Sequence, residues 1–72
     1  MAMLILEATG PKGEELAMQA ADAINVPAGW DSEFDSATFD SDEHGEDELQ
    51  KIVFDALAEI DPDWQSHLRV VE

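Results

Sequence analysis

A chain of 72 residues without a single cysteine has to fold around a core of its own apolar side chains. Disulfides and cysteine-ligated zinc ions are impossible here, although small secreted domains usually rely on such cross-links. Hydrophobic residues make up 44% of the sequence, which is enough for one core. The sequence therefore predicts a single domain over residues 1–72 in a reducing compartment, and we expect a cytoplasmic protein.

The apolar run at the start of the sequence does not predict a targeting or membrane segment. Residues 1–6 are apolar, but the run ends at Glu7 and has no basic stretch before it. No apolar run in the sequence approaches the roughly 20 residues that a membrane span needs. We therefore expect no membrane association.

Acidic side chains dominate the charge of the sequence. Asp and Glu total 18 against three Lys and Arg, so the formal net charge is −15. Such a surface repels nucleic acids and anionic membranes, and it attracts cations and basic proteins. Composition leaves two explanations open. The charge either recognises a basic partner, or it serves solubility and adaptation to a salt-rich cytoplasm.

The first third of the chain predicts a strand followed by a helix. Residues 3–8 are short and apolar, and Gly10 and Pro11 follow them. Residues 12–25 then have helical spacing. Their apolar stripe consists of Leu16, Ala20, Ala23 and Ile24. We expect Gly10 to be the N-cap of this helix and Pro11 its first residue.

The clearest periodicity lies in residues 46–60, which predict a second helix. Its apolar face has helical spacing and consists of Leu49, Ile52, Val53, Ala56, Leu57 and Ile60. The first turn is acidic, as the helix dipole favours. Pro62 ends the helix, because a residue before proline avoids helical backbone angles. Residues 65–71 then predict a final strand.

Residues 30–41 predict a β-hairpin with Asp35 and Ser36 as a two-residue turn. One face of this hairpin would carry Trp30, Phe34, Ala37 and Phe39. The same register places Asp31 opposite Asp40, and like charges directly across two strands are destabilising. A cation or a basic partner would relieve that repulsion.

The predicted element order is β-α-β-β-α-β. Right-handed crossovers then lead to an α+β two-layer sandwich of the ferredoxin-like type, with two helices on one face of an antiparallel sheet. The alternative is a three-stranded β-α-β-α-β sandwich in which residues 30–41 are mostly loop. Neither fold defines a function.

Residues 40–48 partly resemble a calcium-binding loop of the EF-hand pattern. The residues at matching positions, and thus the candidate metal ligands, are Asp40, Asp42 and Glu48, with Gly45 at the sixth position. The twelfth position, which supplies a bidentate Glu in EF-hands, is Lys51 here. The preceding element also reads as a strand. We therefore expect no metal site, and we rank calcium binding as a third functional class.

The sequence contains little that predicts catalysis. None of its four serines lies in a nucleophile-elbow pattern, and its glycines do not form a phosphate-binding loop. A domain of 72 residues also leaves little room for a pocket that excludes water. We expect no enzymatic activity and no cofactor.

The candidate binding residues come from the acidic segment 31–48, which contains half of the carboxylates. They are Asp31, Glu33, Asp40, Asp42, Glu43 and the neighbouring Trp30. Trp side chains often anchor interfaces. The alternative for Trp30 and Trp64 is that they cover the ends of a small core.

These features predict a small acidic interaction protein, such as an inhibitor, an immunity-type or antitoxin-type protein, or an adaptor, that binds a basic protein surface. Carboxylates two residues apart on a strand are spaced like phosphates along a nucleic acid, about 6.6–6.8 Å, so imitation of nucleic acid is a sharper variant. We expect no direct binding of nucleic acid. The alternative is an accessory domain whose acidity is solubility or salt adaptation. Oligomeric state does not follow from the sequence.

Overall fold

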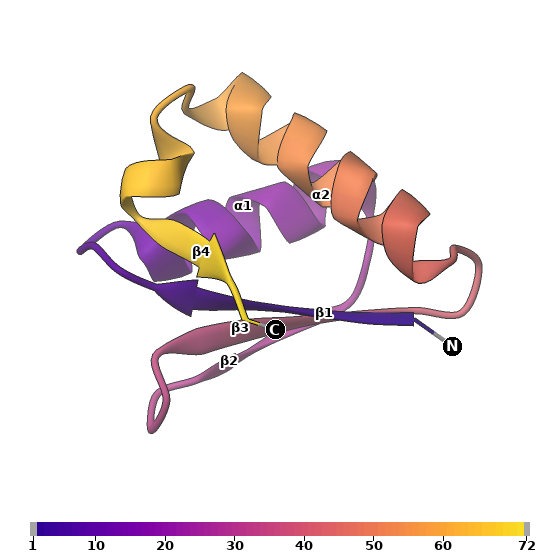
Figure 1. The fold of residues 1–72 in the computed structure, drawn as a ribbon, viewed down its shortest axis with the longest axis horizontal. Helices are drawn as coiled ribbons and strands as arrows, with labels where there is room; N and C mark the ends of the chain where they lie inside the picture. The colour runs from indigo at the N-terminus through magenta and orange to yellow at the C-terminus, as the bar shows by residue number, and fades with distance from the viewer. Residues whose placement is uncertain (1, 72) are drawn as a thin grey trace.

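The computed structural model describes residues 2–71, and it contains one four-stranded sheet and two α-helices (Figure 1). In chain order, the elements are β1 (Ala2–Ala8), α1 (Gly13–Ile24), β2 (Ala28–Asp31), β3 (Ser36–Ser41), α2 (Glu46–Ile60), the short 3-10 helix η1 (Trp64–Ser66) and β4 (Leu68–Val70). The strands lie in the order β2-β3-β1-β4, and each neighbouring pair is antiparallel. The predicted ferredoxin-like sandwich is confirmed, and the three-stranded alternative is wrong.

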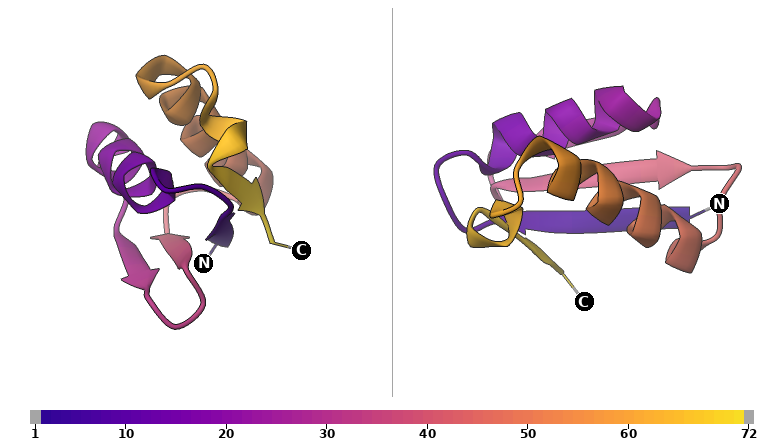
Figure 2. Two further views of the ribbon diagram at one scale, coloured as in Figure 1. Left: turned by 90° about the vertical axis from the view of Figure 1, so that its left-hand side faces the viewer. Right: turned by 90° about the horizontal axis from the view of Figure 1, so that it is seen from above.

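The two helices lie side by side on one face of the sheet, and among the described residues no helix covers the other face (Figure 2). The core lies between the helices and the covered face, where the largest fully buried side chains are Phe39, Leu6, Leu49, Leu57, Leu68 and Val53. Within residues 2–71, no helix is both long enough and apolar enough to cross a membrane.

Strand β1 is central, because it pairs with β3 on one side and with β4 on the other. Alternate side chains of a strand point to opposite faces of its sheet. Leu4 and Leu6 are buried under the helices, whereas Met3 and Ile5 lie on the other face. The register sets Leu4 beside Phe39 on the covered face. This alternation determines which side chains can form the core and which remain on the uncovered face.

Helix α2 has the predicted bounds and buries the predicted face. Leu49, Val53, Ala56 and Leu57 are buried, and Ile52 and Ile60 are partly buried against the same core. The helix ends at Ile60, and Asp61 has extended backbone angles before Pro62. Strong apolar periodicity and a proline were therefore sufficient to predict this element.

Helix α1 differs from its prediction at its start and in its buried face. Lys12 is the N-cap rather than Gly10, and Pro11 precedes the helix. Gly10 donates its backbone N–H to the carbonyl of His67, so the turn is built by contacts with a distant segment. Ala23 is exposed, and the buried side is formed by Gly13, Leu16, Ala17, Ala20 and Ala21. Small residues on both sides of Leu16 let this helix lie close to the sheet.

The β2–β3 hairpin exists, but its predicted turn and register are wrong. Trp30 faces Ala37 and Asp31 faces Ser36, so residues 32–35 form a four-residue loop. One carboxylate oxygen of Asp31 accepts the backbone N–H of Glu33 at 2.9 Å, and this contact turns the chain immediately after β2. Asp35 closes the loop with a φ of 49°, a left-handed conformation that Asp tolerates better than most residues. Phe34 therefore lies at the tip of the hairpin.

The C-terminal strand is shorter than predicted, because residues 64–66 form η1. The hydroxyl of Ser66 donates to the carboxylate of Asp63 at 2.9 Å, which stabilises this turn. Trp64 is 6% exposed and packs on Phe54 with ring centroids 4.9 Å apart. The interpretation of Trp64 as a cover for the end of the core is thus confirmed.

The turn between β1 and α1 approaches the start of β4 very closely. Thr9 donates its backbone N–H to the carbonyl oxygen of His67 at 2.8 Å. A Cβ atom on Gly13 would lie 2.8 Å from that same oxygen and 2.7 Å from the Cβ of Ala8. Both distances are too short for a stable contact, so glycine is required there for packing.

We expect Gly13→Ala to destabilise the fold by about 1–3 kcal/mol through overpacking, although alanine favours helices more than glycine does. Gly29→Ala is the matched control, because an added Cβ there meets no atom within 4 Å. Chemical denaturation of both variants measures the effect. Equal stabilities would mean that the close approach does not constrain the fold.

Leu57→Ala should cost about 2–5 kcal/mol, because the side chain of Leu57 is fully buried and its removal leaves a cavity. In a domain of this size, such a loss approaches the whole stability. Gln50→Ala, an exposed position on the same helix, is the control and should change stability by less than about 0.5 kcal/mol. A urea titration that finds Leu57→Ala as stable as the control would contradict the assigned core.

Candidate functional site

The sheet face without helices, called the open face below, is the most distinctive surface of the molecule. It is formed by the side chains that alternate away from the core on β1 and β3, by Arg69 and Val71 at the β4 end, and by the adjoining hairpin. These residues are Met3, Ile5, Glu7, Asp31, Phe34, Ser36, Thr38, Asp40, Arg69 and Val71. Apolar and acidic side chains are mixed on this face.

The exposed large hydrophobic side chains of residues 2–71 all belong to the open face. Phe34 is 68% exposed, Met3 54% and Val71 41%. Val71 donates its backbone N–H to the carbonyl of Ile5, which places it next to β1. A single exposed hydrophobic residue needs no explanation, but apolar side chains gathered on one face are typical of an interaction surface.

A hollow of about 420 Å³ lies on the open face and extends to Phe34 at the tip of the hairpin. It is lined by Ile5, Glu7, Asp31, Phe34, Ser36, Thr38 and Val71. Its apolar walls come from three separate parts of the chain, and its carboxylates come from β1 and β2. The hollow therefore offers both an apolar contact and negative charge.

The two carboxylates of this hollow have different partners. Arg69 donates to the carboxylate of Glu7 at 3.0 Å, and the two residues face each other across the β1–β4 pair. Asp31 makes no ion pair within residues 2–71. Its carboxylate accepts a hydrogen bond from the backbone N–H of Glu33. Glu7 is thus partly neutralised, whereas the charge of Asp31 is free to attract a cation.

The structure separates the binding residues predicted from the sequence into three locations. Asp31 and Asp40 lie on the open face, and Glu33 lies in the hairpin loop beside it. Trp30 points to the covered face, where it packs against the core. Asp42 and Glu43 lie in the loop before α2, where together with Asp40 they border a second hollow of about 390 Å³.

The predicted repulsion between Asp31 and Asp40 is wrong. Asp31 faces Ser36 across the β2–β3 pair, whereas Asp40 is the register partner of Met3 on β1. Asp40 lies four positions after Ser36 on β3, which corresponds to about 13 Å along the strand. The four-residue hairpin loop causes this shift in register.

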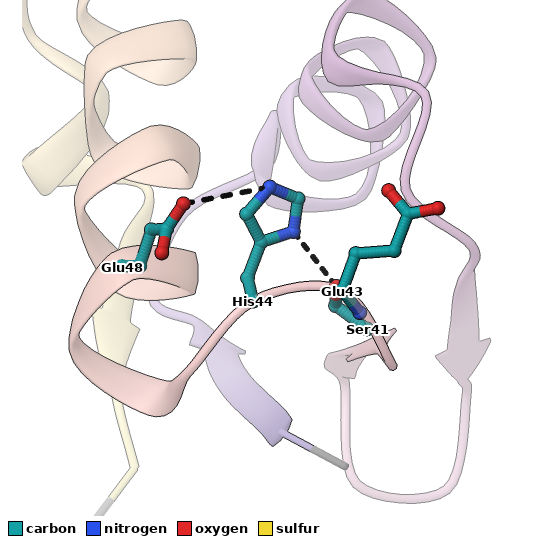
Figure 3. Close-up of polar contacts among 4 residues, drawn as sticks. All are labelled: Ser41, Glu43, His44 and Glu48. Atoms are coloured by element: carbon teal, nitrogen blue, oxygen red, sulfur yellow. Dashed lines mark hydrogen bonds and ion pairs between the residues drawn. The ribbon is translucent and has the colours of Figure 1, made fainter.

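A polar network in the loop before α2 was not predicted (Figure 3). The side chain of Ser41 lies 2.8 Å from Nδ1 of His44, and Nε2 of His44 lies 3.8 Å from Glu48. The backbone N–H of Glu43 donates to the Ser41 hydroxyl at 3.3 Å. In the sequence, Ser41 precedes Glu43 by two residues and His44 by three, and this spacing is typical of serine-containing turns.

The groups in this network are a hydroxyl, an imidazole and a carboxylate, which are also the groups of hydrolase triads. Here they come from one short segment, and the Ser41 residue is 7% exposed. Its hydroxyl already accepts a hydrogen bond from the backbone N–H two residues ahead. The network therefore connects the end of β3 to the first turn of α2. We assign it a structural role.

The EF-hand resemblance does not correspond to a metal-binding geometry. Strand β3 continues to Ser41 and α2 begins at Glu46, so strand and helix occupy much of the stretch that an EF-hand uses as a loop. Across residues 2–71, no three His, Asp or Glu side chains are grouped closely enough to bind a metal ion. Asp40, Asp42 and Glu48 are therefore not brought together as ligands.

Comparisons with protein-family models, with characterised protein sequences and with solved structures found no significant match.

We expect the melting temperature to rise between low and moderate NaCl concentrations. Residues 2–71 contain two contacts between basic and acidic side chains, Arg69–Glu7 at 3.0 Å and His44–Glu48 at 3.8 Å, and the second is an ion pair only when His44 is protonated. The carboxylates of both contacts are partly or largely exposed. Exposed pairs contribute little to stability, whereas salt screens the mutual repulsion of many carboxylates. KCl at equal ionic strength should give the same rise, since the effect is screening and not sodium binding. A steady fall in the melting temperature would show that specific ion pairs contribute more to stability than the repulsion among carboxylates costs.

Proposed function

We propose that this protein is a small, non-catalytic, cytoplasmic interaction protein that binds a basic surface of another protein through its open face. The observation that carries the proposal is the gathering of exposed Met3, Phe34 and Val71 on a face that also presents Asp31 and Asp40. An inhibitor, an immunity-type or antitoxin-type protein and an adaptor all require such a surface.

Charge and apolar contact have different roles in this proposal. Long-range attraction between the acidic protein and a basic partner speeds their encounter and disfavours acidic competitors. The apolar side chains of the face then provide the contact area that is removed from water. Binding should consequently weaken as salt rises, but a residual apolar contribution should remain.

Imitation of nucleic acid has less support than general binding of a basic surface. The phosphate-like spacing applies to carboxylates two residues apart on one strand. Strand β2 ends at Asp31, and Glu33 lies in the following loop. Asp31 and Glu33 therefore do not have the regular strand spacing on which imitation of nucleic acid depends.

The second candidate function is an accessory domain whose acidity serves solubility or salt adaptation. The outer surfaces of both helices favour it, because they also carry exposed carboxylates far from the open face. These residues are Glu14, Glu15, Asp22, Asp55 and Glu59. An even distribution of charge is typical of adaptation, so the two functions make different predictions for variants of equal charge.

Copurification with charge-matched variants tests the proposal. Asp31→Asn with Asp40→Asn removes two charges from the open face, and Asp22→Asn with Asp55→Asn removes two from the helices. All four positions are exposed, so neither pair should unfold the protein. We expect the wild type and the helix variant to retain the same basic protein from the native cell at low salt, and the open-face variant to lose it.

Quantitative mass spectrometry of the retained proteins, at low and at high salt, gives the readout. Equal loss in both variants would indicate nonspecific attraction by total charge. Equal retention in both would indicate that Asp31 and Asp40 do not contact the partner. Either result would contradict the proposal and favour the accessory domain.

A further inference from the structure

We infer that the hollow on the open face binds a lysine or arginine side chain from an extended basic segment of the partner, with apolar residues of that segment packing alongside. This inference rests on the proposed function and assigns the chemistry of the partner and its position. The hollow combines apolar walls with a carboxylate that has no ion pair within residues 2–71, and this combination indicates a long basic side chain as its ligand.

The walls of the hollow suit the aliphatic part of a long basic side chain. Lys and Arg commonly lay their methylene groups on apolar surface while the charged end remains near water. Phe34 and Val71 are exposed and line the hollow together with Ile5. Phe34 also offers an aromatic ring to a cation, which adds a further attraction.

The carboxylates of the hollow suit the charged end of the same side chain. The Arg69–Glu7 pair at 3.0 Å already presents a guanidinium to a carboxylate on this face. Asp31 lines the same hollow and makes no ion pair within residues 2–71. A second guanidinium or ammonium group therefore has Asp31 as its partner, without displacing Arg69.

An extended segment fits better than an isolated cation, because the apolar surface continues beyond the hollow. Ile5 and Val71 also line a further hollow of about 570 Å³ that extends to Met3 and to Glu46 and Gln50 of α2. Strand β4 ends at Val70, whereas β1 continues to Ala2 at the far end of the sheet. An apolar residue next to the basic one would occupy this second hollow, where Glu46 supplies another negative charge.

Titration of the isotope-labelled protein with a short capped peptide, in which arginine alternates with leucine, tests the inference by NMR. We expect saturable amide shifts at Ile5, Phe34 and Thr38. A peptide with citrulline in place of arginine has the same shape without the charge, and it should bind at least about tenfold more weakly. Replacement of leucine by glycine should also weaken binding.

Two variants separate the apolar and the ionic contributions. Phe34→Ser removes an exposed wall and should weaken binding about tenfold. Asp31→Asn removes the charge but keeps an oxygen that accepts the N–H of Glu33, so any loss reflects charge rather than a disrupted turn. Asp22→Asn, on α1, is the control and should leave the affinity unchanged.

The inference is overturned if the arginine peptide does not bind. It is also overturned if the shifts concentrate on residues 42–45, or if Phe34→Ser binds as the wild type does. The proposed function fails separately, when the open-face variant retains the same basic protein as the wild type. If the open-face variant loses that protein, the helix variant retains it and the peptide does not bind, the proposed function stands and the assigned occupant is rejected.

Discussion

Apolar contact between the two helices and the covered face of the sheet is the interaction on which the rest of the structure depends. With 18 acidic and three basic residues, the chain can form few ion pairs, and its carboxylates repel one another. The pairs that residues 2–71 do form lie at the surface, where each contributes little. The fold is therefore stabilised by the fully buried side chains of β1, β3, α2 and β4, against a repulsion that salt reduces.

The sequence was informative wherever one periodicity dominated, and least informative where distant contacts or single hydrogen bonds decided the backbone. The apolar repeat of α2 predicted both its bounds and its buried face. The hairpin register instead depends on the Asp31 turn and on the left-handed backbone of Asp35, which alternation cannot reveal. The start of α1 depends on contacts of Gly10 and Gly13 with His67, more than 50 residues away.

The sequence predicted some residues of the candidate site, but the reason for which it selected them differs from the arrangement in the structure. Asp31 and Asp40 were identified from their position in the acidic segment, and both lie on the open face. Their predicted opposition is absent, so electrostatic strain does not explain their presence. Phe34 was predicted to share one face of the hairpin with Trp30, whereas the four-residue loop places it at the tip. The contribution of Val71 required the pairing of β4 with β1.

The open face follows from the topology, because two crossover helices can cover only one side of a four-stranded sheet (Figure 2). In such a sheet, polar side chains can occupy the uncovered side at no cost to the core. Met3, Ile5 and Val71 instead place apolar groups there, and the hairpin loop adds Phe34. Core packing does not require these residues, since their side chains lie on the opposite side of the sheet from the helices. The interaction proposed above would use both features: the acidic surface would attract a basic partner from a distance, and the apolar groups on the open face would provide the contact.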